Sequence, residues 1–197
     1  MVSLLVIVVA GVTIGIFVGA WLLGDDAGPL AFLSQGETTT TLTAAELHQR
    51  DHLLGQLPII AGRYHSTPEM LMDDFMNVLS LLYGPYLDDE LMFTEVIRVQ
   101  RTLFGQELLA LNSMDSQTQQ FIATARTNWS QGVYQSAIEL IAIQFETDYT
   151  VAYVRQYFEN LGTVNWVYFI NYDQGFKVSS FFQADDDFVP IAGWLDQ

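Results

Sequence analysis

The sequence contains no cysteine among its 197 residues. Without cysteine the chain can form no disulfide bond, can use no thiol nucleophile and can offer no thiolate ligand to a metal ion. This absence excludes thiol enzymes and disulfide scaffolds. It does not by itself fix the compartment in which the protein works.

Basic residues are scarce. The chain has 7 Lys and Arg against 23 Asp and Glu, a formal net charge of −16, and Lys177 is its single lysine. Such a chain repels phosphate backbones and anionic lipid headgroups, so we expect no nucleic-acid partner. The expected partners are a basic protein surface or divalent cations. Alternatively, the excess charge serves solubility or adaptation to salt.

No charged residue occurs before Asp25. As a helix, residues 2–23 would reach roughly 33 Å, which is enough to cross the hydrocarbon core of a bilayer. A cleaved signal peptide needs a basic start and a small-residue cleavage site, but this run starts without Lys or Arg and ends in Trp21-Leu22-Leu23. The early glutamate of bacterial pilins is also missing. The sequence therefore predicts a retained transmembrane signal-anchor helix over residues 1–24.

Three glycines recur at intervals of four within this run, at Gly11, Gly15 and Gly19. Four residues turn a helix by about 400°, so these glycines lie close to one face. Small residues let membrane helices approach closely, and the spacing predicts packing against another subunit or a second copy. The alternative is that glycine is simply common in membrane helices.

No Lys or Arg flanks the predicted anchor, because the first is Arg50. The positive-inside rule then gives little direction, and Asp25-Asp26 weakly favours export of the residues C-terminal to the anchor. We expect the large domain outside the cytoplasmic membrane, in the periplasm if the source is a bacterium. Residues 25–42, rich in Gly, Pro, Ser and Thr, are predicted to form a linker.

Residues 43–197 are long enough for one domain. Thr43 and Glu46 match a helix-capping box, and a second helix start stands at Thr67-Pro68. Apolar residues at helical spacing predict helices over much of 44–160. The predicted segments are about 44–56, 66–83, 89–111, a stretch from 115 to 145, and 148–160.

Two histidines, His48 and His52, are four residues apart in the first of these segments. That spacing places both imidazoles on one face of a helix, as a metal site requires. No third ligand is in view, so we expect no metal or other cofactor and interpret both histidines as exposed.

The last part of the chain changes to the pattern of a β-hairpin. Two β-branched and aromatic runs within residues 164–183 flank a turn at Asp173-Gln174-Gly175. The apolar tail, residues 188–197, is expected to dock on the domain or on a partner. The predicted partner contacts are aromatic residues of this region: Trp166, Tyr168, Phe181, Phe182 and Trp194.

The hairpin contains the pattern W-x-Y-x-I-x-Y-D-x-G-x-x-V, from Trp166 to Val178. Over about thirty residues this resembles a strand pair of extracytoplasmic sensor domains of the PAS or Cache kind. The resemblance implies a ligand-binding sensor. One hairpin leaves no room for the five-stranded sheet of such domains, and no output module is present.

No G-x-S-x-G, H-E-x-x-H, P-loop or G-x-G-x-x-G motif occurs, so we predict that the chain is not an enzyme. The predicted fold is α+β: one transmembrane helix, then a mostly helical extracytoplasmic domain with a C-terminal antiparallel hairpin. The predicted function is that of a non-catalytic accessory or assembly subunit of a larger membrane protein complex. The alternative is a membrane-anchored, ligand-binding sensor subunit.

Overall fold

The computed structural model describes residues 42–87 and 89–191. The predicted anchor 1–24, its glycines at 11, 15 and 19, most of the linker and Trp194 therefore lie outside the described residues.

The predicted membrane-spanning element has no counterpart in the described part of the chain. Among residues 42–87 and 89–191, no helix combines the length and the apolar character needed to cross a bilayer. The prediction of a single-pass membrane protein is corrected accordingly. The described fold is an α+β domain of five helices followed by a four-stranded antiparallel sheet.

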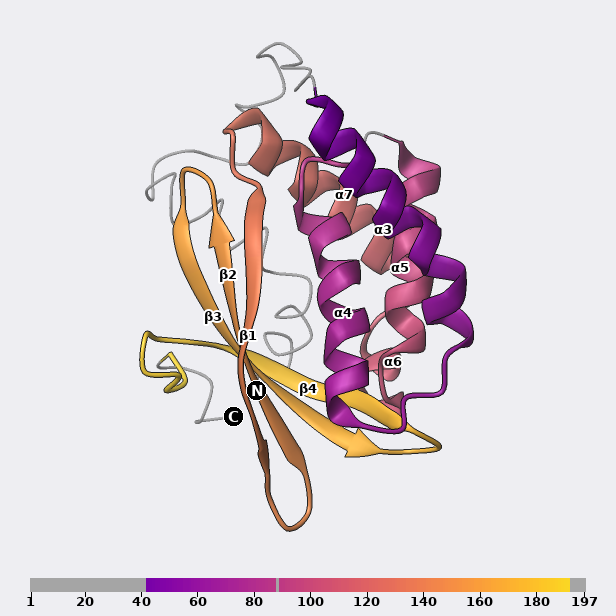
Figure 1. Ribbon diagram of the computed structural model, residues 1–197, viewed down its shortest axis with the longest axis vertical. Coiled ribbons are helices and arrows are strands. Elements are labelled where there is room, and N and C mark those ends of the chain that lie inside the picture. Colours follow the sequence, from indigo (N-terminus) through magenta and orange to yellow (C-terminus); the bar gives the residue numbers. More distant parts are fainter. Residues whose placement is uncertain (1–41, 88, 192–197) are drawn as a thin grey trace, which may run out of the picture.

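Five helices form one layer of the domain (Figure 1). The predicted capping box starts the first of them, because Thr43 N donates to Glu46 Oε2 at 2.7 Å and Glu46 N donates to Thr43 Oγ1 at 3.3 Å. The start at Thr67-Pro68 is confirmed as well. The helices are α3 (Ala44–Gly62), α4 (Pro68–Tyr83), α5 (Glu90–Thr102), α6 (Gln106–Leu111) and α7 (Met114–Ser130).

Two helix ends differ from the prediction. Helix α3 continues through Pro58 to Gly62, where it buries Leu57 and Ile60. Burial of these side chains outweighs the hydrogen bond lost at the proline. The segment predicted as one helix over 89–111 breaks at Leu103–Gly105, because Gly105 N donates to Val178 O at 2.8 Å. The backbone N–H of Gly105 is thus bonded to a strand instead of to the preceding turn of the helix.

The sheet is a meander in which consecutive strands are neighbours, in the order β1-β2-β3-β4. The predicted hairpin is confirmed as β3 and β4, joined by a turn in which Gly175 adopts φ 115°. The predictions of helix over 133–145 and 148–160 are wrong, since these residues form β1 and β2. The strands are β1 (Gln135–Phe145), β2 (Thr150–Phe158), β3 (Gly162–Tyr172) and β4 (Phe176–Ala184).

The physical reason for the error is the burial of these strands. In β2, Val151 and Ala152 are adjacent and both buried, because one faces each side of the sheet. In β1 the register shifts between Leu140 and Ala142, and this bulge breaks the alternation of apolar and polar residues. The domain therefore carries a four-stranded sheet beside its helices, rather than a single hairpin.

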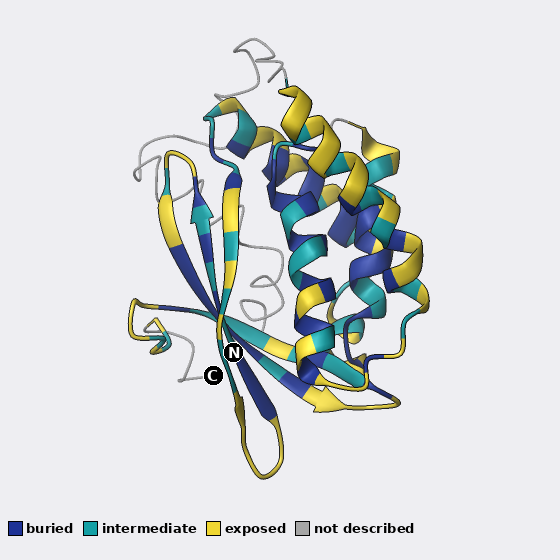
Figure 2. Cartoon of the chain, viewed as in Figure 1, coloured by how far each residue is buried: buried dark blue, intermediate teal, exposed yellow. Residues whose placement is uncertain are grey.

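The main core lies between the helices and one face of the sheet (Figures 1 and 2). The Phe75 ring of α4 contacts Tyr168 of β3 edge-on, with 5.2 Å between ring centroids, and contacts Phe104 at 6.0 Å. Deep burial concentrates in α4 and in the central strands, whereas α3 is largely exposed. The helices therefore cover one face of the sheet, and no described helix covers the other face.

Candidate protein-interaction surface

The sheet face opposite the helices carries a second apolar cluster. Side chains alternate across a strand, so the residues between the core positions of β2, β3 and β4 point to this side. We call the resulting group the outer-face cluster. It consists of the buried Val151, Val167 and Ala184 and the partly buried Tyr153, Phe169, Phe182 and Phe188.

The aromatic rings of this face form a row of three and a separate pair. Phe169 lies 5.5 Å from Tyr149 and 5.8 Å from Phe182, measured between ring centroids, and Tyr153 lies 5.3 Å from Phe188. Tyr149, in the β1–β2 turn, is 43% exposed. The face thus presents partly exposed aromatic rings that pack on the buried Val151, Val167 and Ala184.

A turn after β4 positions Phe188 on this face. Asp185 Oδ1 accepts hydrogen bonds from the backbone N–H groups of Asp187 and Val189, at 3.0 and 2.9 Å. Phe188 sits at the centre of this turn with φ 61°, a left-handed conformation that is costly for a bulky residue. The ring contact with Tyr153 and the Arg155 guanidinium 5.6 Å from the ring centroid offset that cost.

Polar contacts tie the same turn to the sheet. Arg155 Nε donates to Asn165 Oδ1 at 2.9 Å, and Asn165 Nδ2 donates to the carbonyl of Asp185 at 3.0 Å. Asn165 is 3% exposed. Each of these polar groups has a hydrogen-bond partner. The turn is therefore fixed by hydrogen bonds as well as by the packing of the Phe188 ring.

The rim of the face is acidic. Asp185, Asp186 and Asp187 are exposed directly after β4, and Glu139 of the edge strand β1 accepts a hydrogen bond from Tyr157 of β2. Asp185 is committed to capping its turn, as described above. In the described part of the chain Glu139, Asp186 and Asp187 form no ion pair, so they are available to basic groups on a partner.

The sequence-predicted contact residues fall in different places. Trp166 and Tyr168 are each 2% exposed and belong to the main core, and Phe181 packs against that core. Phe182 alone of the described four lies on the outer face. Trp194 is outside the described residues. Val151 and Tyr153 of the cluster were missed because β2 was predicted to be a helix.

The two edges of the sheet differ. Along β4, the loop Leu103–Gly105 pairs with Val178, and Pro190 bridges to Ala184. Along β1, the described residues provide no second neighbour, and Ile141 and Phe145 are 40% and 66% exposed. The β1–β2 hairpin also projects beyond the helical layer (Figure 1). An open apolar edge of this kind favours pairing with another strand.

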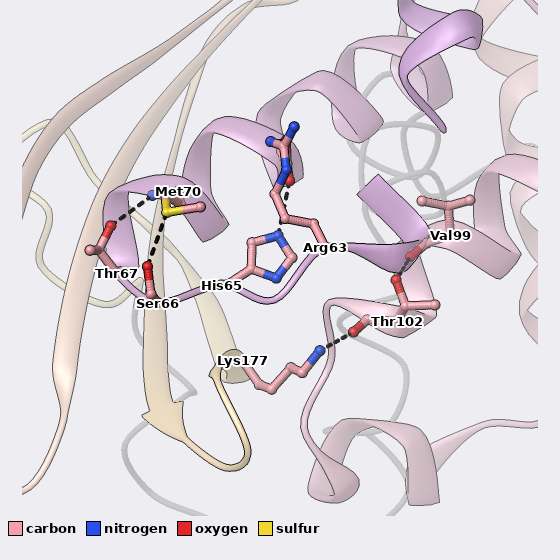
Figure 3. Close-up of polar contacts among 9 residues, drawn as sticks. Arg63, His65, Ser66, Thr67, Met70, Val99, Thr102 and Lys177 are labelled. Carbon is pink, nitrogen blue, oxygen red and sulfur yellow. Dashed lines mark hydrogen bonds and ion pairs between the residues drawn. The ribbon is translucent and has the colours of Figure 1, made fainter. Parts of the chain in front are cut away.

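A buried polar centre lies on the helical side (Figure 3). Asp74 of α4, 3% exposed, accepts from Arg63 Nη1 at 2.7 Å and from His65 Nε2 at 2.9 Å. A carboxylate can only accept, so His65 carries its proton on Nε2. The carbonyl of His65 accepts from Phe176 N at 2.9 Å. The centre therefore fastens the α3–α4 link to the start of β4.

The chemistry of this centre is structural. Lys177 donates to the carbonyl of Thr102 (Figure 3), and burial lowers the pKa of its amine. His65 Nδ1 is buried and has no hydrogen-bond partner among the described residues. Among the described residues no hydroxyl bonds to this imidazole, so these contacts give no activated nucleophile of the kind acyl transfer needs.

The two histidines considered as metal ligands, His48 and His52, are exposed on α3. In the part of the chain that the structure describes, no three His, Asp or Glu side chains come together in a way that could hold a metal ion. A small void between α4 and α7, lined by Tyr83 and Asn128 among others, has about 10 Å³, which is room for one water molecule.

Comparison with protein-family models, with curated proteins and with solved structures found no match for this chain.

Proposed function

We propose that this chain is a non-catalytic assembly subunit that binds a partner protein through the outer-face cluster. The observation that carries the proposal is a row of partly exposed aromatic rings, around Tyr149, Phe169 and Phe182, on the sheet face that no described helix covers. Aromatic residues at the centre of a contact supply most of the binding energy at protein interfaces.

The acidic rim supports a particular kind of partner. Carboxylates lie in β1 and directly after β4, beside the outer-face cluster, and the whole chain carries a net charge of −16. A partner with an apolar centre and a basic rim would be attracted during encounter and would satisfy these carboxylates on docking. An acidic partner would be repelled, which gives the surface selectivity as well as affinity.

The alternative function, a ligand-binding sensor, lacks an observation of its own. The void between α4 and α7 has about 10 Å³, which is too small for a metabolite. The extracytoplasmic location expected from the sequence stays a prediction, because the residues on which it rests lie outside those that the structure describes.

The proposal is tested by placing a photo-crosslinking amino acid at Tyr149 of the full chain in cells of its source organism. The matched control is Tyr64, which is 56% exposed and lies on the α3–α4 link, away from the cluster. We expect one discrete adduct from position 149, with the same protein in repeated preparations, and none from position 64.

Binding of the partner so identified is then measured with two purified variants. Truncation of an interfacial aromatic ring costs more than about 1 kcal/mol at a contact centre, or roughly a fivefold weakening. We expect that loss for Tyr149→Ser and no change for Tyr64→Ser. Equal adducts from both positions, or an equal effect of both substitutions, would overturn the proposal.

A further inference from the structure

Strand β4 forms a protected edge of the sheet, and strand β1 does not. Residues Leu103–Gly105 pair with Val178, and Pro190 bridges to Ala184. Lys177, a residue type that opposes strand pairing, lies in β4 as well. The sequence of β1, QSAIELIAIQF, contains no Lys or Pro, and among the described residues its only neighbouring strand is β2. The sheet therefore has one edge that is available to a further strand.

The hydrogen bonds at the two ends of the β1–β2 pair show which backbone groups of β1 face this edge. Glu146 N donates to Tyr149 O at 2.9 Å, and Glu159 N donates to Tyr134 O at 2.9 Å. Hydrogen-bonded pairs alternate with unbonded pairs along antiparallel strands. Counting inward from either end through the register of the two strands gives the same result. Between residues 137 and 145, the N–H and C=O groups that point away from β2 belong to Ile138, Leu140, Ile143 and Phe145.

The bulge in β1 makes this set symmetric. Because the register shifts after Leu140, the four residues are spaced two, three and two positions apart. The set therefore reads the same in both directions about a centre between positions 141 and 142. An antiparallel copy of β1 placed about that centre pairs Ile138 with Phe145 of the second copy. It also pairs Leu140 with Ile143, and no other antiparallel register lets all four residues meet one another.

We propose that two copies of this chain associate through their β1 edges, as an antiparallel pair about a two-fold axis at the bulge. Such a contact is self-complementary and closes after two copies. Ile138 packs against the main core, whereas Phe145 is 66% exposed and lies beyond the helical layer, in the projecting β1–β2 hairpin (Figure 1). Pairing covers the Phe145 ring with Ile138 of the second copy and joins the two sheets into one.

The charges of β1 are compatible with this contact. Residues 140–145 carry no charge, and the one charged residue of the strand, Glu139, comes opposite Gln144 of the second copy. The two Glu139 positions are then five residues apart along the sheet, or roughly 17 Å. That is longer than the screening length of about 10 Å at 0.1 M salt, so these carboxylates do not oppose pairing at physiological salt.

The test is disulfide formation between two single-cysteine variants of the full chain, Glu139→Cys and Gln144→Cys. The natural chain has no cysteine, so each variant carries one thiol. Both residues are exposed, and their backbone groups point to β2, which makes them an unbonded pair across the interface, with Cβ atoms close enough for a disulfide. We expect a disulfide-linked dimer when the variants are mixed under reducing conditions and then oxidised, and none from either variant alone.

The matched control mixes Ala137→Cys with Gln144→Cys. Ala137 is exposed on the same side of β1 as Glu139, but it lies two residues further along the strand. In the proposed register this adds about 7 Å to the separation of the thiols. We expect the control mixture to form the disulfide at least about tenfold more slowly.

A second measurement removes the apolar contact. Phe145→Lys and its control Tyr172→Lys add the same charge at aromatic residues of nearly equal exposure, 66% and 64%, but Tyr172 lies at the β3–β4 turn. We expect Phe145→Lys to weaken dimerisation by at least about tenfold in sedimentation equilibrium, because each contact occurs twice in a symmetric dimer. Tyr172→Lys should leave the dimerisation constant unchanged.

Three results would overturn the inference: no disulfide between positions 139 and 144, equal rates in the control mixture, or equal effects of the two lysine substitutions. The inference goes beyond the proposed function, because it concerns a second copy of the chain rather than a different protein. These experiments use the purified chain alone, whereas the adduct at Tyr149 identifies another protein in cells. The inference and the proposed function can therefore fail separately.

Discussion

At the scale of single residues, Asp74 is the most constrained charge in the described domain. It is buried, and it accepts hydrogen bonds from Arg63 and His65 on the segment that joins α3 to α4. Removal of one member of a buried pair leaves the charge or donor of the other member unsatisfied. The stability lost in this way is larger than the stability that the intact pair adds compared with well-packed apolar side chains. Asp74 is therefore expected to contribute more to the stability of the domain than most side chains of its size.

We expect Asp74→Asn to lower the free energy of unfolding by roughly 3 kcal/mol. An amide offers one acceptor where the carboxylate offers two, so either Arg63 or His65 loses its partner. The measurement is equilibrium unfolding in urea. The control is Glu95→Gln, which breaks an exposed pair with Arg98 and should cost about 0.5 kcal/mol or less. Equal effects of the two substitutions would contradict this account.

The sequence could not reveal this residue pair. His48 and His52 attract attention because their spacing fits one face of a helix, yet both are exposed. His65 lies in a non-periodic link, and no spacing rule connects it to Asp74. Its role depends on where α4 and the start of β4 meet, and that is a property of the folded chain.

At the scale of elements, helices were easier to predict than strands. The helix starts predicted at Thr43 and Thr67 are fixed by local hydrogen bonds of these side chains, and both are confirmed. Strand β1 contains a bulge and β2 is buried on both faces, so neither shows the alternation that identifies a strand. The hairpin β3–β4 was recognisable because a glycine turn sits between two aromatic runs.

The open edge of β1 leads to a prediction about association. We expect Ile141→Lys to slow aggregation of the purified chain at high concentration, because a charge on an exposed edge opposes pairing with another strand. Light scattering at constant temperature measures the rate. Stability should change by less than about 1 kcal/mol, since Ile141 is exposed at the bulge.

The control for this variant is Leu91→Lys, on the exposed face of α5. Leu91 is 77% exposed, so the same substitution adds the same charge without touching a sheet edge. If both variants slow aggregation equally, net charge rather than the edge controls association.

At the scale of the whole molecule, acidic charge dominates. The net charge is −16, whereas the exposed ion pairs Arg50–Asp51, Arg98–Glu95 and Arg126–Glu90 each contribute less than about 1 kcal/mol. Salt screens both the repulsion and these pairs, but the repulsion involves many more charges. Screening should therefore stabilise the protein on balance.

We expect the melting temperature to rise by about 3–4 °C, or roughly 1 kcal/mol, between about 0.01 M and 0.5 M NaCl. Thermal unfolding followed by circular dichroism measures it. The double variant Asp186→Asn/Asp187→Asn removes two exposed charges and should respond less to salt. A fall in melting temperature with added salt would show that the ion pairs outweigh the repulsion.

The order of the two layers along the chain has a consequence for synthesis. All five described helices precede the first strand, so the ribosome releases the helical layer before any of the sheet that covers it. The Phe75 ring cannot pack against Tyr168, its partner in the core, until β3 has been synthesised. During that interval the apolar side of α4 is exposed to solvent and to other nascent chains. A chaperone that binds short apolar helices would thus meet this protein during translation and release it once β3 has emerged.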